Sequence, residues 1–309
     1  MAGPISIFDV AGAKFEEYAR EDWLGLHRTP GIITASMVPT ILGLNKYESP
    51  FSLWQKLKGL MPWGDESFRM RSGHGLEPII ADEYTAQTGR ELRDPGEYAI
   101  VRHPDLDWLL STIDRVAVNG VPRDVELKST EIFSEAAAFW RTKGIPIENQ
   151  VQVQAQLSCL GWEHGSVAAM IGLSSVVCVD VVRSDDFIAT MLNSLDEFRD
   201  MLITETPPPV GGSEPDTEAL KALHPKDNGK QVFLSEEAMK KDERLQELKL
   251  RTKSVGKEID ELQNWFKNEI GDNSVGVLPH GGSYSWKWQE RAAYEVERSE
   301  YRTFRRHKK

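Results

Sequence analysis

Two segments decide the fold of this chain, Ser111-Thr-Ile-Asp114 and Asp124-Val-Glu-Leu-Lys-Ser129. They lie in apolar runs that predict strands over 108–118 and 124–130. Asn119-Gly120 joins the two runs, and this dipeptide is a strong hairpin signal because both residues tolerate positive φ. The pattern therefore predicts two neighbouring antiparallel strands, each with acidic residues.

The acidic and basic residues of these strands point to phosphodiester chemistry. Alternate side chains of a strand share one face, so Glu126 and Lys128 are expected to point together, Leu127 the opposite way, and the hairpin brings Asp114 alongside. Divalent cations such as Mg2+ prefer carboxylate oxygens, and an ammonium can orient a metal-activated water. The pattern is that of metal-dependent nucleases. A ladder of exposed charge pairs on an edge strand is the alternative interpretation.

The Glu-x-Lys triplet alone carries little information. Glu247-Leu-Lys249 repeats it inside an expected helix, where residues two apart point in different directions. The copy at Glu126 differs because it lies on an expected strand, after a hairpin and downstream of Asp114.

The sequence up to residue 205 predicts a mixed α/β unit, with a central mixed sheet flanked by helices. Apolar periodicity and the positions of Gly and Pro predict helices over 13–28, 50–60, 75–88, 148–160 and 187–203. A Val- and Ala-rich run over 167–182 predicts one or two buried strands with a break near Gly172. We expect this domain to span 1–205.

The remaining sequence predicts a linker and a C-terminal arm. Thr206-Pro-Pro-Pro-Val-Gly-Gly-Ser213 has the composition of a linker, which we place over 206–234. Within 235–309, apolar residues recur at alternating spacings of three and four, which predicts a long amphipathic helix with a partner surface. These residues are Leu245, Leu248, Thr252, Val255, Ile259, Leu262 and Phe266. The partner is either a second copy or another protein.

A hairpin and a basic tail are expected after this helix. Runs over 275–279 and 284–289 predict the hairpin. Tyr284, Trp286 and Trp288 alternate along its second strand, as a packed face or as a platform for stacking bases. The tail over 299–309 carries a local excess of basic residues.

Composition limits the classes of protein that this chain can represent. Its 309 residues include 37 Lys and Arg against 48 Asp and Glu, a net charge of −11, which argues against coating nucleic acid by bulk electrostatics. A local basic channel for DNA is still compatible with that charge. Two cysteines cannot form a disulfide scaffold. No signal-peptide pattern or run of about 20 apolar residues is present, so we expect a cytoplasmic protein.

Several segments in chain order resemble the YqaJ-type viral recombinase family, which includes phage lambda exonuclease. They are Arg28-Thr-Pro-Gly-Ile-Ile-Thr-Ala-Ser36, Gly73-His-Gly-Leu-Glu-Pro78, Asp114, Glu126-Leu-Lys128 and the glutamines of 150–156. The resemblance covers about 28–161. It implies a PD-(D/E)xK, restriction-endonuclease-like core, with 1–205 as a YqaJ-like exonuclease domain.

The function implied by this resemblance is a Mg2+-dependent 5′→3′ exonuclease acting on double-stranded DNA ends. Such an enzyme leaves 3′ single-stranded overhangs for phage homologous recombination, beside a single-strand annealing protein and in the host cytoplasm. The resemblance also implies two metal ions in each site, with Mn2+ as a substitute for Mg2+, and a ring-shaped trimer.

Site residues follow from the same resemblance. The side chains of Asp114, Glu126 and Glu77 and the carbonyl of Leu127 would hold the metal, and Lys128 would position the attacking water. A pocket for the 5′-phosphate would be formed by Arg28, Ser36, Thr112 and Gln152.

Two points stay open at this stage. Gln150, Gln152 and Gln154 compete for the role of active-site glutamine, and Gln152 is preferred because Gln-x-Gln-x-Gln-Leu then aligns with the family. Arg115 stands where many relatives have Gly, so it either reaches the DNA backbone or is solvated. The alternatives to the exonuclease are a structure- or sequence-specific endonuclease of the same fold and a catalytically silent DNA-binding or assembly module.

Overall fold

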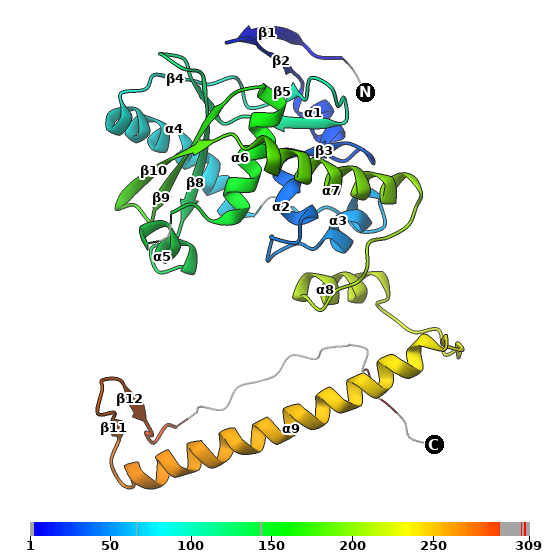
Figure 1. Ribbon diagram of the computed structural model, residues 1–309, viewed down its shortest axis with the longest axis vertical. Helices are drawn as coiled ribbons and strands as arrows, with labels where there is room; N and C mark the ends of the chain where they lie inside the picture. The colour runs from blue at the N-terminus through cyan, green and yellow to red at the C-terminus, as the bar shows by residue number, and fades with distance from the viewer. Residues whose placement is uncertain (1–2, 66, 143, 291–303, 305, 307–309) are drawn as a thin grey trace. The chain divides into compact units, whose positions relative to one another are not determined.

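The computed structural model describes residues 3–65, 67–142, 144–290, 304 and 306 (Figure 1). Backbone contacts divide the chain into two compact units, 1–224 and 225–309. Each unit is described by itself below.

The first unit is built on two five-stranded mixed sheets. One sheet has the strand order β1-β2-β5-β6-β3, in which only β3 and β6 run parallel. The other has the order β10-β9-β8-β7-β4, in which only β8 and β9 run parallel. The strands are β1 (Ser6–Val10), β2 (Ala13–Glu17), β3 (Ile33–Thr34), β4 (Leu92–Arg93), β5 (Ala99–Arg102), β6 (Leu109–Thr112), β7 (Arg115–Ala117), β8 (Arg123–Thr130), β9 (His164–Ile171) and β10 (Ser175–Val182).

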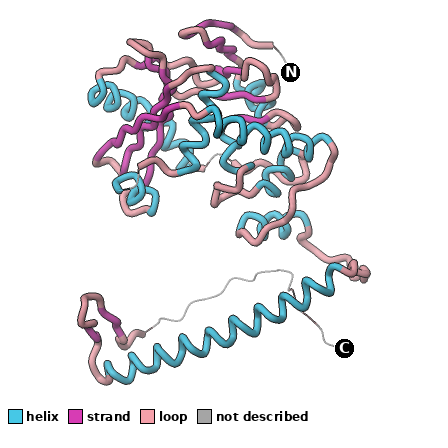
Figure 2. Tube along the Cα trace, in the orientation of Figure 1, coloured by secondary structure: helices cyan, strands magenta, loops and turns pink. Residues whose placement is uncertain are grey.

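Helices cover both faces of the second sheet (Figures 1 and 2). In β9, Val167, Ala169 and Ile171 belong to the main apolar core with residues of α6 and α7, whereas Ala168 and Met170 pack in a smaller cluster with α4. This alternation places the sheet between two helical layers. The helices of the first unit are α1 (Arg20–His27), the short 3-10 turn η1 (Ala35–Met37), α2 (Val38–Ile41), α3 (Pro50–Leu57), α4 (Phe68–Thr88), α5 (Glu135–Thr142), α6 (Ile147–Leu160), α7 (Asp185–Ile203) and α8 (Glu214–Leu223).

The structure confirms the predicted helices α3, α6 and α7 and the two strands that flank Gly172. The helix predicted over 13–28 is wrong in its first part, because Ala13–Glu17 is the strand β2. Ala13 and Phe15 are buried while Lys14 is exposed, which is the alternation of a strand. Pairing with β1 and β5 outweighs the helix propensity of this Lys- and Glu-containing segment.

Two other predicted elements have different limits. Helix α4 begins at Phe68, where the side chain of Ser67 accepts a hydrogen bond from the Met70 amide, and it continues through Pro78. The sequence predicts a start near Gly75, so the helix is about two turns longer at its N-terminal end than predicted. The single strand predicted over 108–118 is instead two strands, β6 and β7, which belong to different sheets and are separated by Ile113 and Asp114.

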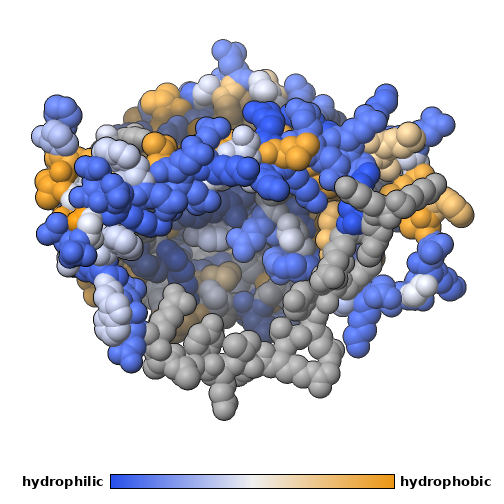
Figure 3. Space-filling model, turned by 90° about the horizontal axis from the view of Figure 1, so that it is seen from below, coloured by the Kyte–Doolittle hydropathy of each residue, from blue (hydrophilic) through white to orange (hydrophobic). Residues whose placement is uncertain are grey.

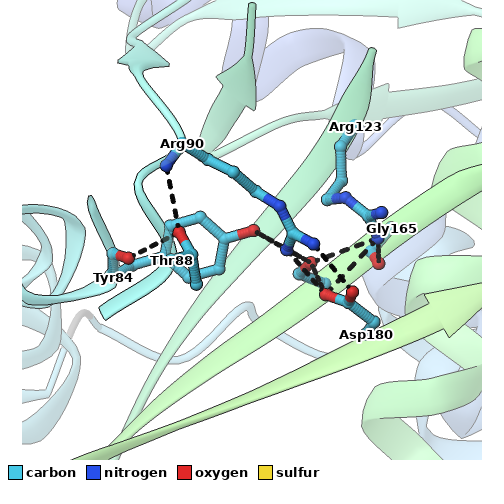
Figure 4. A network of polar contacts seen from close by, with 7 residues as sticks. Tyr84, Thr88, Arg90, Arg123, Gly165 and Asp180 are labelled. Carbon is cyan, nitrogen blue, oxygen red and sulfur yellow. Dashed lines mark hydrogen bonds and ion pairs between the residues drawn. The ribbon is translucent and has the colours of Figure 1, made fainter. Parts of the chain in front are cut away.

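A polar network fixes the C-terminal end of α4 to the second sheet (Figure 4). The guanidinium of Arg90 donates to both carboxylate oxygens of Asp180, at 2.7 and 2.9 Å, and also to the hydroxyl of Tyr84 at 2.8 Å. Ser166 donates to Asp180 at 2.8 Å, and Arg123 lies 3.4 Å away. Asp180 therefore joins β10 to β8, β9 and α4.

Asp180→Asn should lower stability at neutral pH and have no effect in strong acid. The hydrogen bonds from Arg90, helped by Ser166 and Arg123, lower the pKa of Asp180 to about 2. A lowered pKa stabilises the fold above the unfolded value of about 4, and that stabilisation is lost as pH falls from about 4 to 2. Because the side chain is 49% exposed, we expect at most about 1 kcal/mol. Thermal unfolding of both proteins between pH 2 and 7 measures the difference, and a pH-independent difference would contradict this origin.

Helix α8 lies within the stretch whose composition predicts a linker, and it packs on α3. Ser49 at the start of α3 donates to the Asp216 carboxylate at 2.6 Å, and Ser213 donates to the same group at 2.7 Å. The first compact unit accordingly extends to His224.

The second unit contains the predicted long helix, α9 (Glu237–Ile270), and the predicted hairpin, β11 (Val275–Val277) with β12 (Ser283–Ser285). The hairpin packs on the end of the helix, where Ile270 is buried and the rings of Phe266 and Tyr284 lie 4.2 Å apart. Trp286 and Trp288 are exposed. Of the basic tail, Arg306 contacts Asp242 at 2.8 Å, and most of the other tail residues lie outside the described residues.

Hydrophilic residues cover most of the face seen in Figure 3, and hydrophobic residues form separate patches there. Within the described residues, no helix is both long and apolar enough to cross a membrane.

Candidate active site

Asp114 lies at the point where the chain passes from one sheet to the other. The ladder between β7 and β8 ends at the pair Arg115 and Val125, one residue after Asp114. Further along β8 the Asp114 carboxylate takes the place of a strand partner. Its Oδ2 accepts a hydrogen bond from the Leu127 amide at 2.8 Å. The predicted juxtaposition of Asp114 with β8 is therefore present, although Asp114 is in a bend and not in a strand.

The carbonyl of Leu127 is directed to the same edge of β8. The amide and carbonyl of one residue in an extended strand point to the same side, and the amide of Leu127 points to Asp114. The side chain of Leu127 packs on α4 in the smaller apolar cluster. The backbone oxygen of Leu127 is thus directed to the edge of β8 at which the Asp114 carboxylate lies.

Glu126 is 2% exposed and both of its carboxylate oxygens accept hydrogen bonds. Oε1 accepts from the Lys128 ammonium and from the Gln152 amide, the latter at 2.7 Å. Oε2 accepts from the Gln156 amide at 2.5 Å. The carbonyl of Gln152 lies 3.3 Å from Lys128 Nζ, so Glu126, Lys128 and Gln152 form a closed triangle.

Helix geometry separates the four glutamines of α6 into two pairs. Gln152 and Gln156 are four residues apart, share one face, and both contact Glu126. Gln150 instead donates to the Ile145 carbonyl at 2.7 Å, and Gln154 donates to the Val182 carbonyl at 2.8 Å. The structure therefore brings Gln152 to the acidic site and places Gln150 and Gln154 elsewhere. Gln156 belongs to the same run of glutamines, and its i, i+4 spacing from Gln152 is the sequence signal that places both on one face of α6.

The electrostatics of this site favour a bound cation. Burial raises the pKa of Asp114 well above its usual range, and the charge of Glu126 raises it further. For Lys128, burial acts to lower the pKa, but the attraction of Glu126 and Asp114 outweighs it and the pKa is raised. Lys128 is therefore an ammonium at physiological pH. Two close carboxylates repel each other, and a cation between them offsets that repulsion.

Glu77 lies near the same edge, on α4, and is held by Arg115. Arg115 Nη1 is 3.8 Å from the Glu77 carboxylate and 3.2 Å from that of Asp94, and it also donates to the Asp114 carbonyl. Arg115 is therefore an internal ion-pair residue, and of the two alternatives left open by the sequence the solvated side chain does not agree with its 13% exposure. Burial raises the pKa of Glu77 even though His74 and Arg115 act to lower it.

Asp124 is a further buried acid on the face of β8 that carries Glu126 and Lys128. It is fully buried, and neither carboxylate oxygen has a hydrogen-bond partner among the described residues. Burial raises the pKa of Asp124 well above its usual range, with a further contribution from Glu126. The alternation Asp124, Glu126, Lys128 is visible in the sequence, although the Asp…Glu-x-Lys pattern of the nuclease site does not include Asp124.

The residues expected to bind a 5′-phosphate occupy neighbouring elements. Ser36 and Thr112 each lie two residues beyond the last pair of the parallel strands β3 and β6, and α6, which carries Gln152, contacts both η1 and β6. Thr112 accepts the indole N–H of Trp23 at 3.0 Å, which ties it to α1. Arg28 caps the end of α1, where its guanidinium lies 5.8 Å from the ring centroid of Trp63.

The oxygen donors of the site fit Mg2+ or Mn2+. Within the part of the chain that the structure describes, no three His, Cys, Asp or Glu side chains gather into a metal-binding group. Mg2+ does not require such a group, because it is usually bound through one or two carboxylates and retains several waters. Asp114, Glu126 and the Leu127 carbonyl provide the required hard oxygen donors.

Comparison with known proteins agrees with this geometry. Residues 22–163 match the family described as the YqaJ-like viral recombinase domain. The uncharacterized protein YqaJ of Bacillus subtilis (strain 168) is 30% identical over 282 residues, which cover 90% of this chain and 85% of that protein. The crystal structure of LHK-Exo, an alkaline exonuclease from Laribacter hongkongensis, in complex with dAMP has a TM-score of 0.50 and 21% identity, covering 60% of this chain and 94% of that chain.

These comparisons bear separately on fold and family. The likeness to LHK-Exo concerns the fold, an α/β core with mixed sheets flanked by helices, as expected from the sequence. The match to YqaJ extends over most of both chains and confirms the resemblance seen in the motifs. This chain belongs to the YqaJ-like viral recombinase family.

Proposed function

We propose that this protein is a divalent-metal-dependent 5′→3′ exonuclease that resects double-stranded DNA ends and leaves 3′ single-stranded overhangs. The observation that supports this most directly is the convergence of Asp114, Glu126 and Lys128 around the backbone of Leu127. The exonuclease named in the LHK-Exo structure has the same fold, which is consistent with this chemistry. The overhangs would serve homologous recombination by single-strand annealing.

Asp114, Glu126 and the Leu127 carbonyl would hold Mg2+ or Mn2+ in this proposal, with two ions in each site and Glu77 as an additional ligand. When bound, the metal supplies charge neutralisation at the phosphate and lowers the pKa of a coordinated water. Lys128 holds its proton because Glu126 and Asp114 surround it, so its N–H groups can orient a water and donate to a phosphate oxygen. Gln152 fixes the carboxylate of Glu126 and the ammonium of Lys128 at the same time.

The 5′-phosphate of a DNA end would be held by Arg28, Ser36, Thr112 and Gln152. A guanidinium offers a planar fork for phosphate oxygens, and the two hydroxyls and the amide offer further donors. A fixed terminal phosphate places the first phosphodiester at the acidic site, which favours cleavage from an end over internal cleavage. This pocket is the part of the proposal that sets polarity.

Two assembly features complete the proposal, a homotrimeric ring that encloses DNA and cooperation with a single-strand annealing protein. A ring that encloses the duplex would keep the protein on DNA even though its net charge of −11 repels the phosphate backbone. Sedimentation of the full-length protein with and without a linear duplex tests the trimer, and pull-down with a purified annealing protein tests the partner.

The decisive experiment is a time course on linear duplex DNA labelled at either end, with a 5′-phosphate or a 5′-hydroxyl, in Mg2+. We expect loss of the 5′ label first, preference for the phosphorylated end, and no cleavage of closed circular DNA. Chelation of the metal should abolish the reaction. Cleavage of circles would support an endonuclease instead, and DNA binding without turnover in Mg2+ and Mn2+ would support the silent module.

A further inference from the structure

Helix α9 presents an apolar seam that nothing in the described part of its unit covers. The helix has 34 residues, about 51 Å at 1.5 Å for each residue. Along it Leu248, Val255, Ile259 and Leu262 are 41–63% exposed, at the a/d spacing of a coiled coil. The hairpin β11–β12 contacts only the last turns, near Phe266 and Ile270.

Charge divides this helix into two halves of opposite sign. Residues 237–257 contain seven Lys and Arg against four Asp and Glu, a net charge of +3 by count. Residues 258–270 contain one Lys against four Asp and Glu, a net charge of −3 by count. A second copy in antiparallel orientation places each basic half beside an acidic half, whereas a parallel copy places like charges together.

The seam residues match in the antiparallel orientation. When the helices run in opposite directions, an a position of one faces a d position of the other. The layers would then be Leu245 with Leu262, Leu248 with Ile259, and Thr252 with Val255, each formed twice by symmetry. Between Leu245 and Leu262 the apolar residues of one copy are therefore opposite apolar residues of the other, apart from Thr252, whereas Phe266 packs on Tyr284 of its own hairpin.

The residues that flank the seam distinguish the two orientations. In the antiparallel pair, Arg251 meets Glu258 of the second copy, twice by symmetry, and Arg244 meets Trp265 of the second copy, which permits a cation–π contact. In a parallel pair, Arg244 would instead meet Lys249 of the second copy, also twice. Neither Arg251 nor Glu258 has an ion-pair partner among the described residues. Both are therefore available for an intermolecular pair.

We infer that α9 is a dimerisation arm through which two copies of this chain associate in antiparallel orientation. The occupant of the seam is a second copy, because the seam and its flanking charges are complementary to themselves when reversed. This inference does not depend on nuclease activity, since it concerns the mass of the assembly and not cleavage.

The test exchanges the charges of the predicted ion pair in the full-length protein, with association measured by sedimentation velocity over a range of concentrations. Arg251→Glu places Glu against Glu258, and Glu258→Arg places Arg against Arg251, so each variant should associate about tenfold more weakly than wild type. The double variant restores opposite charges and should recover wild-type association. A mixture of the two single variants should also recover it, because every pair in the mixed dimer is opposite in charge.

Matched controls change the same charges away from the seam. Lys253→Glu and Glu261→Arg lie at outward positions of the same heptads and should associate as wild type. Circular dichroism of each variant verifies that α9 remains helical. Ile259→Asp, in the centre of the seam, should abolish association through α9.

The same measurements can overturn the inference. The inference fails when Ile259→Asp leaves the association of the full-length protein unchanged. It also fails when the single charge reversals associate as strongly as wild type, or when the mixture of the two single variants associates as weakly as each variant alone. An assembly held together by the first unit would persist in all variants. Only a further doubling of the mass of that assembly is assigned to α9, where each chain contributes 34.9 kDa.

Discussion

Lys128→Ala should lower the rate of metal-dependent DNA cleavage by about 10²–10⁴-fold. Lys128 is the one cation in direct contact with Glu126 among the described residues, and its ammonium is also within reach of Gln152. Its removal eliminates the donor that orients water and stabilises charge on the phosphate. The expected effect is on the chemical step, so kcat falls while binding of duplex DNA changes little.

Single-turnover cleavage of 5′-phosphorylated duplex measures this loss. Lys249→Ala is a matched control, because Glu247-Leu-Lys249 has the same three residues on the exposed surface of α9 and should retain wild-type activity. Since Lys128→Ala also leaves Glu126 without its cation in a buried site, thermal unfolding and DNA binding must be measured on the same preparation. Retention of full cleavage by a folded Lys128→Ala protein would refute the proposed site.

Asp124→Asn should stabilise the folded protein at neutral and alkaline pH, relative to its effect at pH 4, by about 1–3 kcal/mol. Asp124 is fully buried, has no hydrogen-bond partner among the described residues, and shares its face of β8 with Glu126. Burial raises the pKa of Asp124 well above its usual range. Ionisation of this group therefore favours unfolding, and an amide of the same shape does not ionise.

The pH dependence identifies the cause of this stabilisation. With the folded pKa raised, the cost of Asp124 is absent below the unfolded pKa of about 4 and is largest above the folded pKa. The advantage of Asp124→Asn in chemical denaturation should therefore grow from pH 4 to pH 8. Asp180→Asn, which removes a hydrogen-bonded carboxylate on β10 of the same sheet, should have the opposite sign at pH 7. A variant at 124 that is less stable at every pH would show that this carboxylate has a favourable partner.

Much of the central site could be predicted because a strand has a simple period. Residues two apart on β8 share one face of the strand, so Glu126 lies beside Lys128. Leu127 points to the opposite face, where it packs on α4. The hairpin signal also identified the correct partner strand. The connection spans residues 118–122 and is not a two-residue turn, and the side chain of Asn119 bonds to the backbone of Gly89 and Glu91.

Features that depend on tertiary partners were not predictable from local pattern. The hairpin of β1 and β2 turns at Ala11 and Gly12, which both have positive φ, and Ala at such a position gives no turn signal. The identity of the glutamine beside Glu126 depends on how α6 is rotated against the sheet. The internal position of Arg115 depends on Asp94, which lies outside the motif segments.

The bond between the Asp114 carboxylate and the Leu127 amide joins the two sheets at the residue that is also a proposed metal ligand. A substitution of Asp114 would therefore remove a proposed metal ligand and a structural hydrogen bond at the same time. A substitution of Lys128 removes only side-chain contacts, those with Glu126 and Gln152. Loss of the Asp114 carboxylate would also leave the Leu127 amide without this acceptor, at the point where the chain crosses from β6 to β7. A variant at position 114 is therefore expected to lose folding stability as well as the proposed ligand, and thermal unfolding must accompany any measurement of its cleavage.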